Sequence, residues 1–307
     1  MNLRIDAERG PILAAGGVLL AAAVGMLAIR LESSWGKGVH LIVELAAFAV
    51  IFGMAWLSPL AERPLAYQST LAVTGLVLLV VVLFRLADVF GVENTGNAGT
   101  LIWISAMFTL VAGLAATRFA SVASALFACI GAAVFAVAVI DKVFDPHGFT
   151  TFRWVFFLLT IVFAVAAAGL GRGPRPGFAV AAVNAAGLML LALLATFVVS
   201  EFAYAFAALD RDVVGESVSG PGWGWKLVLV VGSLAVIAYA AVRRERGPGF
   251  IGGFALLLAI VVIGRPHEEA SVVGWPVLLL LAALATLALG LAPRQGDGAG
   301  GAPPPTA

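Results

Sequence analysis

Residues 98–140 read AGTLIWISAMFTLVAGLAATRFASVASALFACIGAAVFAVAVI, an apolar stretch whose single charged side chain is Arg118. A helix crosses the membrane hydrocarbon in about 20 residues, because it rises about 1.5 Å per residue. This stretch is about twice that long, and one helix would place Arg118 at mid-membrane with more length than tilting accommodates. It therefore predicts two spanning helices, 98–117 and 120–140, joined by a hairpin at Arg118 and Phe119.

The rest of the chain has the same apolar character. Of 307 residues, 62% are hydrophobic and 11% are charged, and the mean hydropathy is +1.07, whereas about a quarter of the residues of a soluble protein are charged. The sequence predicts an all-α integral membrane protein of about ten transmembrane helices in five consecutive hairpins, a single polytopic domain over 1–292. The ten apolar runs are 11–29, 39–58, 68–87, 98–117, 120–140, 153–171, 178–200, 226–242, 248–264 and 274–292.

Two short arginine-rich turns predict the orientation. They contain Arg172 and Arg175, and Arg243, Arg244 and Arg246. Short basic loops stay in the cytoplasm, which favours a plasma-membrane protein with both termini cytoplasmic, N-in and C-in. The 11–29 run is interpreted as a retained anchor, because it is long for a signal peptide and Arg30 follows it directly. Residues 293–307 are predicted to be a disordered cytoplasmic tail.

Charge and cysteine content exclude several classes of function. The 18 basic and 17 acidic residues leave a net charge of +1, so the chain lacks the basic field that neutralises phosphates and no nucleic-acid partner is expected. Cys129 is the one cysteine, which excludes an internal disulfide and a thiolate metal site. Because the sequence contains no metalloprotease, hydrolase-elbow or phosphate-loop signature, no enzymatic activity, metal or cofactor is expected.

Five of the seven tryptophans lie near the start of even-numbered predicted helices, on one face of the membrane. They are Trp35, Trp103, Trp154, Trp225 and Trp275. Tryptophan favours headgroup depth, so these residues predict an outer aromatic belt. The pattern returns after four helices, which indicates either tandem parallel repeats of hairpins or simply a tryptophan anchor on every such helix.

Glu44 is the ionisable residue that lies away from the ends of the predicted spans. It lies about 7–8 Å into the 39–58 run, with His40 one turn before it and Lys37 a further turn back on the same helical face. Charge inside a bilayer is costly, so His40, Glu44 and Lys37 are predicted to form an outward-facing site for a cation or a proton. The alternative is that Glu44 reaches interfacial water, or pairs with His40 or Lys37 to hold helices together.

The remaining polar features favour structural roles. Arg85 and Asp88 have the spacing of an ion pair on one helix, and Asn184 is placed to hydrogen-bond between helices. The 201–225 loop is predicted to begin with a separate interfacial helix. Three glycines indicate a close-packed or broken ninth helix: Gly249, Gly252 and Gly253. A weaker candidate, a divalent-cation site in the outer loops, would draw on Asp141, Asp145, His147, Asp210, Asp212, Glu216, His267, Glu268 and Glu269.

Several segments of the first 120 residues resemble a known group. Trp35-Gly-Lys37, LAVTGLVLL from Leu71 and LADVF around Asp88 are similar to uncharacterised bacterial multi-pass integral membrane proteins of the DUF2157 type. The resemblance implies a bacterial membrane protein and supplies no site residues. Drug/metabolite transporters match in helix number and short loops, but their inverted repeats would move the tryptophans to alternate membrane faces.

Three functions are compatible with these patterns. The first is a non-enzymatic structural or accessory component of the membrane, whose partners are the lipid bilayer and either other membrane proteins or further copies of the chain. The second is a small-solute or cation transporter or channel with its site at His40 and Glu44. The third is a membrane enzyme that uses the outer carboxylates, and it is the least favoured because no catalytic motif is present.

Overall fold

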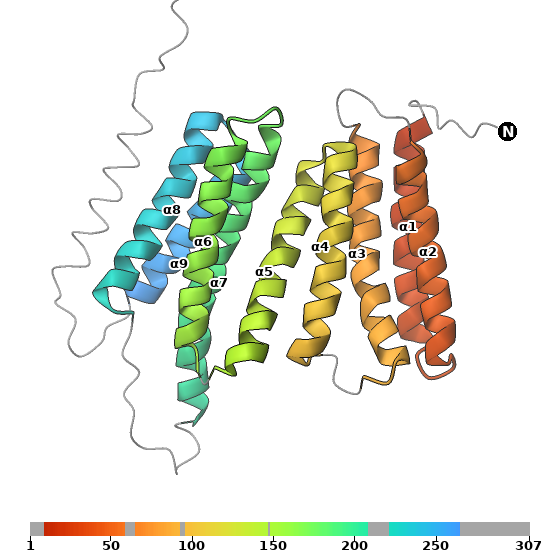
Figure 1. The fold of residues 1–307 in the computed structure, drawn as a ribbon, viewed down its shortest axis with the longest axis horizontal. Helices are drawn as coiled ribbons and strands as arrows, with labels where there is room; N and C mark the ends of the chain where they lie inside the picture. The colour runs from red at the N-terminus through yellow and green to blue at the C-terminus, as the bar shows by residue number, and fades with distance from the viewer. Residues whose placement is uncertain (1–8, 59–64, 93–95, 147, 208–220, 265–307) are drawn as a thin grey trace, which may run out of the picture. The chain divides into compact units, whose positions relative to one another are not determined.

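The computed structural model describes residues 9–58, 65–92, 96–146, 148–207 and 221–264, and all regular structure in these ranges is helical (Figure 1). The described helices are α1 (Gly10–Arg30), α2 (Lys37–Leu57), α3 (Ala66–Val89), α4 (Ala98–Phe119), α5 (Val122–Phe144), α6 (Thr150–Leu170), α7 (Gly177–Ala207), α8 (Trp223–Arg243) and α9 (Arg246–Ile263). Each is long and apolar enough to cross a membrane. The all-helical class is thus confirmed for this part of the chain. The tenth run, 274–292, and the tail, 293–307, lie outside it.

The turn between α4 and α5 lies two residues later than predicted. Arg118 and Phe119 still belong to α4, and the turn consists of Ala120 and Ser121. Ala120 adopts the left-handed conformation, with φ of 50°, which ends α4. The side-chain oxygen of Ser121 accepts a hydrogen bond from the backbone N–H of Ser124 at 3.3 Å, which starts α5. The two-helix hairpin is therefore confirmed, and its break at Arg118 and Phe119 is wrong.

The seventh helix is longer than its predicted span. α7 continues without a break from Gly177 to Ala207, so the separate interfacial helix predicted to begin at residue 201 is wrong. Residues 201–207 read EFAYAFA and contain no glycine or proline that would end a helix. They extend α7 beyond the 178–200 run instead.

The chain divides between Leu193 and Leu194 into two compact units, and each is described by itself. In the first unit the consecutive helices alternate in direction, with α2 and α1 packed on α3, and α4 packed on α5 (Figure 1). In the second unit α8 packs on α9. The single-domain arrangement over 1–292 stays a prediction.

Small side chains fill much of the space between the helices. Ala72 and Ala115 are fully buried, beside larger residues such as Ile51 and Leu71. Large apolar side chains such as those of Ile12, Ile29 and Phe250 instead face outward, each more than 70% exposed. Lipid tails are as apolar as these side chains, so helix association in a bilayer depends on close packing of small residues. This distribution fits helices surrounded by lipid.

α8 and α9 approach each other closely at Gly252. A Cβ atom added there would lie 3.0 Å from the backbone nitrogen of Ile237 and 3.1 Å from the backbone oxygen of Ser233. A Cβ added at the adjacent Gly253 would meet no heavy atom within 4 Å. The ninth helix is therefore close-packed and unbroken, which resolves the two alternatives that its glycines left open.

The packing at Gly252 predicts opposite effects for two neighbouring alanine substitutions. Gly252→Ala forces α8 and α9 apart and should lower the free energy of unfolding by about 1–3 kcal/mol, the usual cost of overpacking. Gly253→Ala is the matched control and should raise it by about 0.5–1 kcal/mol, because alanine favours the helix. Thermal or denaturant unfolding of the purified protein measures both. Equal effects of the two substitutions would contradict the close approach.

Candidate functional site

Two ion pairs connect α2 to α3. Lys37 Nζ lies 2.7 Å from Asp88 Oδ1, and Arg85 Nε lies 3.5 Å from Glu44 Oε1. The two helices are consecutive and antiparallel, so the start of α2 faces the end of α3. From the start of α2 inward, Lys37 and then Glu44 face Asp88 and then Arg85 of α3, so each charge meets an opposite one. This match favours the observed register of the two helices.

These partners correct the predicted pairings. Arg85 and Asp88 do not pair with each other on α3, because each meets an opposite charge on α2 at closer range. The alternative pairing of Glu44 with Lys37 is also wrong, since Lys37 pairs with Asp88. The sequence analysis missed Arg85 as the partner of Glu44. The signal for it was the matching order of charges on two neighbouring helices.

Glu44 is buried, while its partner reaches the surface. Its side chain is 2% exposed and that of Arg85 is 27% exposed. Neither carboxylate oxygen of Glu44 accepts a hydrogen bond from the described residues. A buried carboxylate ordinarily accepts several, so this one keeps the capacity to bind a further donor.

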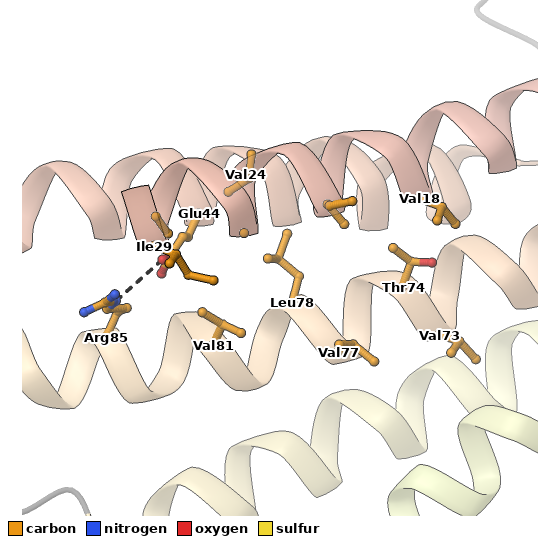
Figure 2. A pocket seen from close by; sticks show the side chains of 14 residues that line it. Val18, Val24, Ile29, Glu44, Val73, Thr74, Val77, Leu78, Val81 and Arg85 are labelled. Carbon is orange, nitrogen blue, oxygen red and sulfur yellow. Dashed lines mark ion pairs between the residues drawn. The ribbon is translucent and has the colours of Figure 1, made fainter. Parts of the chain in front are cut away.

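Glu44 and Arg85 lie at one end of an apolar pocket of about 560 Å³ in the first unit (Figure 2). In the view of Figure 2 the other end lies at Val18 and Val73. The walls between these ends come from α1 and α3 and consist mainly of valine, alanine, glycine and leucine side chains. Its volume falls within the roughly 300–1,000 Å³ that is usual for small-molecule sites.

His40 does not line the pocket and makes no hydrogen bond to Glu44. Its side chain is buried, and its ring centroid lies 5.3 Å from that of Trp35. Neither ring nitrogen makes a hydrogen bond with the described residues, so the predicted pairing of His40 with Glu44 is absent. Of the predicted trio Lys37, His40 and Glu44, the structure places one residue in the pocket, Glu44.

Three of the tryptophans predicted to form a belt lie near the starts of alternate helices of the first unit. Trp35 precedes α2, Trp103 lies in the second turn of α4, and Trp154 lies near the start of α6. These helices begin at the same end of the unit (Figure 1). Trp225 lies at the start of α8 in the second unit, and Trp275 lies outside the described residues. The assignment of this end to the outer membrane face stays a prediction.

The other polar candidates do not gather into a site. Asn184 Oδ1 is buried and accepts no hydrogen bond from the described residues, so the predicted interhelical hydrogen bond is not made through that oxygen. Within the described ranges no three His, Cys, Asp or Glu residues lie close enough to hold a metal ion. Of the outer-loop residues considered for a cation, the structure describes Asp141 and Asp145.

Comparison with known proteins does not assign this arrangement to a family. The chain matches no protein-family model, no curated protein and no solved structure at a significant level. The chemistry of the Glu44 pocket therefore has to be argued from its own residues.

The difference in burial predicts unequal contributions of the two ion pairs to stability. Arg85→Gln leaves the buried Glu44 without a cation and should lower the free energy of unfolding by about 3 kcal/mol. Adding Glu44→Gln should restore most of that loss, because the uncompensated charge is then removed. Asp88→Asn is the matched control and should change stability by less than about 1 kcal/mol, since Lys37 is exposed.

Thermal unfolding of the single and double variants, analysed as a double-mutant cycle, measures these changes in the free energy of unfolding. Equal losses in Arg85→Gln and Asp88→Asn would show that the buried Glu44 does not depend on Arg85.

Proposed function

We propose that the chain is a non-enzymatic multi-pass protein of the plasma membrane that binds a small cationic solute at Glu44, as a transporter or channel does. The observation that carries this proposal is the buried Glu44 carboxylate, which has no hydrogen-bond donor among the described residues, at the end of a pocket of about 560 Å³. A carboxylate in this setting attracts a cation strongly, because the surroundings screen its charge poorly. The accessory-component hypothesis, with protein partners in the membrane, stays a prediction.

The proposal includes the orientation inferred from the arginine-rich turns. With an N-in chain, the ends of α1 and α3 and the start of α2 face the outside, so the Glu44 end of the pocket lies in the outer half of the membrane. Arg85, which is partly exposed, then marks the route from the outer surface to the carboxylate.

The cation-binding proposal predicts a ligand-dependent gain of stability that requires Glu44. The wild type and Glu44→Gln would be unfolded thermally in nanodiscs between about pH 5 and 8, with sodium, methylammonium or tetramethylammonium. A bound cation should raise the unfolding midpoint of the wild type. At a cation concentration one hundred times its Kd, the free energy of unfolding should increase by about 2.7 kcal/mol. Glu44→Gln should lose that shift, and Asp88→Asn, the control, should retain it. Equal shifts in all three proteins would overturn the proposal.

The orientation predicts which turns react from outside the cell. In a Cys129→Ala background, Gly36→Cys in the turn before α2 should react with a membrane-impermeant maleimide on intact cells. Arg172→Cys, in the turn after α6, should react only after permeabilisation. Both positions are exposed in the structure, so burial does not limit either reaction. The reverse pattern would place the Glu44 end of the pocket on the cytoplasmic side.

A further inference from the structure

The geometry points to a more specific ligand, an amphiphilic ammonium ion whose charged head binds Glu44 and whose hydrocarbon tail lies along the pocket between α1 and α3. This inference rests on the proposed function and adds the chemical class of the ligand. It depends on three features of the pocket: the unmet hydrogen-bonding capacity of Glu44, the apolar walls, and the openness of the pocket along its side.

The chemistry of the ligand's head group is inferred from the missing hydrogen-bond donors at Glu44. Both carboxylate oxygens are buried and accept no hydrogen bond from the described residues, and Arg85 Nε, at 3.5 Å, is close enough to compensate charge. A primary ammonium supplies three N–H donors, which this carboxylate lacks, and a positive charge that can take the place of Arg85. An anionic head would instead meet the buried negative charge.

The hydrocarbon tail of the ligand is inferred from the length and the apolar lining of the pocket. From Arg85 to Val73 the pocket follows α3 for about 18 Å, at 1.5 Å of rise per residue. Apart from Glu44, Arg85 and Thr74, its lining side chains are apolar. A hydrated metal ion uses little of such a long apolar space, whereas an extended alkyl chain fills it.

The pocket is also open along its side. Gly25 on α1, and Ile29 and Val77 on the two walls, are exposed residues that line it. In a membrane-spanning unit these exposed flanks meet lipid, so a tail can slide in from the bilayer while its charged head stays toward the headgroup region.

Arg85 has a defined part in this binding. Its side chain is 27% exposed, so it can turn toward water and leave Glu44 to the incoming ammonium. The two cations then exchange on one carboxylate, and Arg85 competes with the ligand. Removing Arg85 should therefore strengthen ammonium binding, whereas it would abolish the binding of an anion held by the guanidinium.

The test compares methylammonium with octylammonium on protein in nanodiscs, with octanoate and octanol as probes of the same tail length. Affinities are expressed as ratios between variants in the same lipid, so partition of each probe into the bilayer cancels. Glu44→Gln should weaken octylammonium binding by about tenfold or more, and Arg85→Gln should strengthen it. Binding to Arg85→Gln is measured well below its unfolding midpoint.

The tail site is tested by filling it. Gly25 lines the pocket, and a Cβ added there meets no heavy atom within 4 Å, so Gly25→Leu adds volume at the tail site without a clash at Cβ. It should weaken octylammonium binding by about tenfold and leave methylammonium binding unchanged. Gly16→Leu, at an equally open position of α1 outside the pocket lining, is the matched control and should change neither. Ala22→Leu fills the pocket from a neighbouring position and serves if Gly25→Leu does not fold.

The outcomes separate this inference from the proposed function. If both ammonium ions bind through Glu44 and Gly25→Leu affects neither, the tail site is wrong and the cation-binding function stands. If octanoate binds tightly and requires Arg85, the ligand is an anion and the ammonium assignment is overturned. If no probe depends on Glu44, both proposals fail.

Discussion

A carboxylate surrounded by apolar helices needs a counter-charge, and the first unit is arranged around that requirement at Glu44. Arg85 supplies the charge from α3, and the neighbouring pair of Lys37 and Asp88 repeats the match at the helix ends. These pairs favour one register for α2 against α3. α1 also packs on α3. The walls of the pocket, which come from α1 and α3, therefore depend on the position of α3 that the ion pairs favour.

The spans were predictable because hydrocarbon leaves the backbone few choices: a long apolar run has to be a helix of membrane-crossing length. The ends of the helices were less predictable, because they depend on local conformation. The left-handed Ala120 and the cap by Ser121 end and start helices inside a continuous apolar stretch, where hydropathy does not change. The extension of α7 past residue 200 similarly follows from the absence of a helix breaker rather than from hydropathy.

The candidate site was predictable in part. The depth of Glu44 in its run identified it, because a charge in that position is unusual whatever surrounds it. Its partner was missed although the order of charges on α2 and α3 matched, and the pocket was not predictable, since its lining residues come from three helices. Spacing along one helix suggested that Arg85 pairs with Asp88, and only the packing of α2 on α3 brings each of them closer to an opposite charge. The pocket depends on one face of α1, a helix that is apolar on all sides, so hydropathy does not single out the residues that line it.

The opposite end of the first unit carries a contact with a consequence for biosynthesis. Arg175, in the turn after α6, donates a hydrogen bond through Nη1 to the backbone oxygen of Thr117 at 3.1 Å, in the last turn of α4. The last carbonyls of a helix have no partner within it, and this one is met by a side chain that the ribosome adds 58 residues later. Until α5, α6 and the turn after α6 have been synthesised, this carbonyl lacks the side chain that it bonds in the folded unit, so the end of α4 is completed by a residue from two helices later.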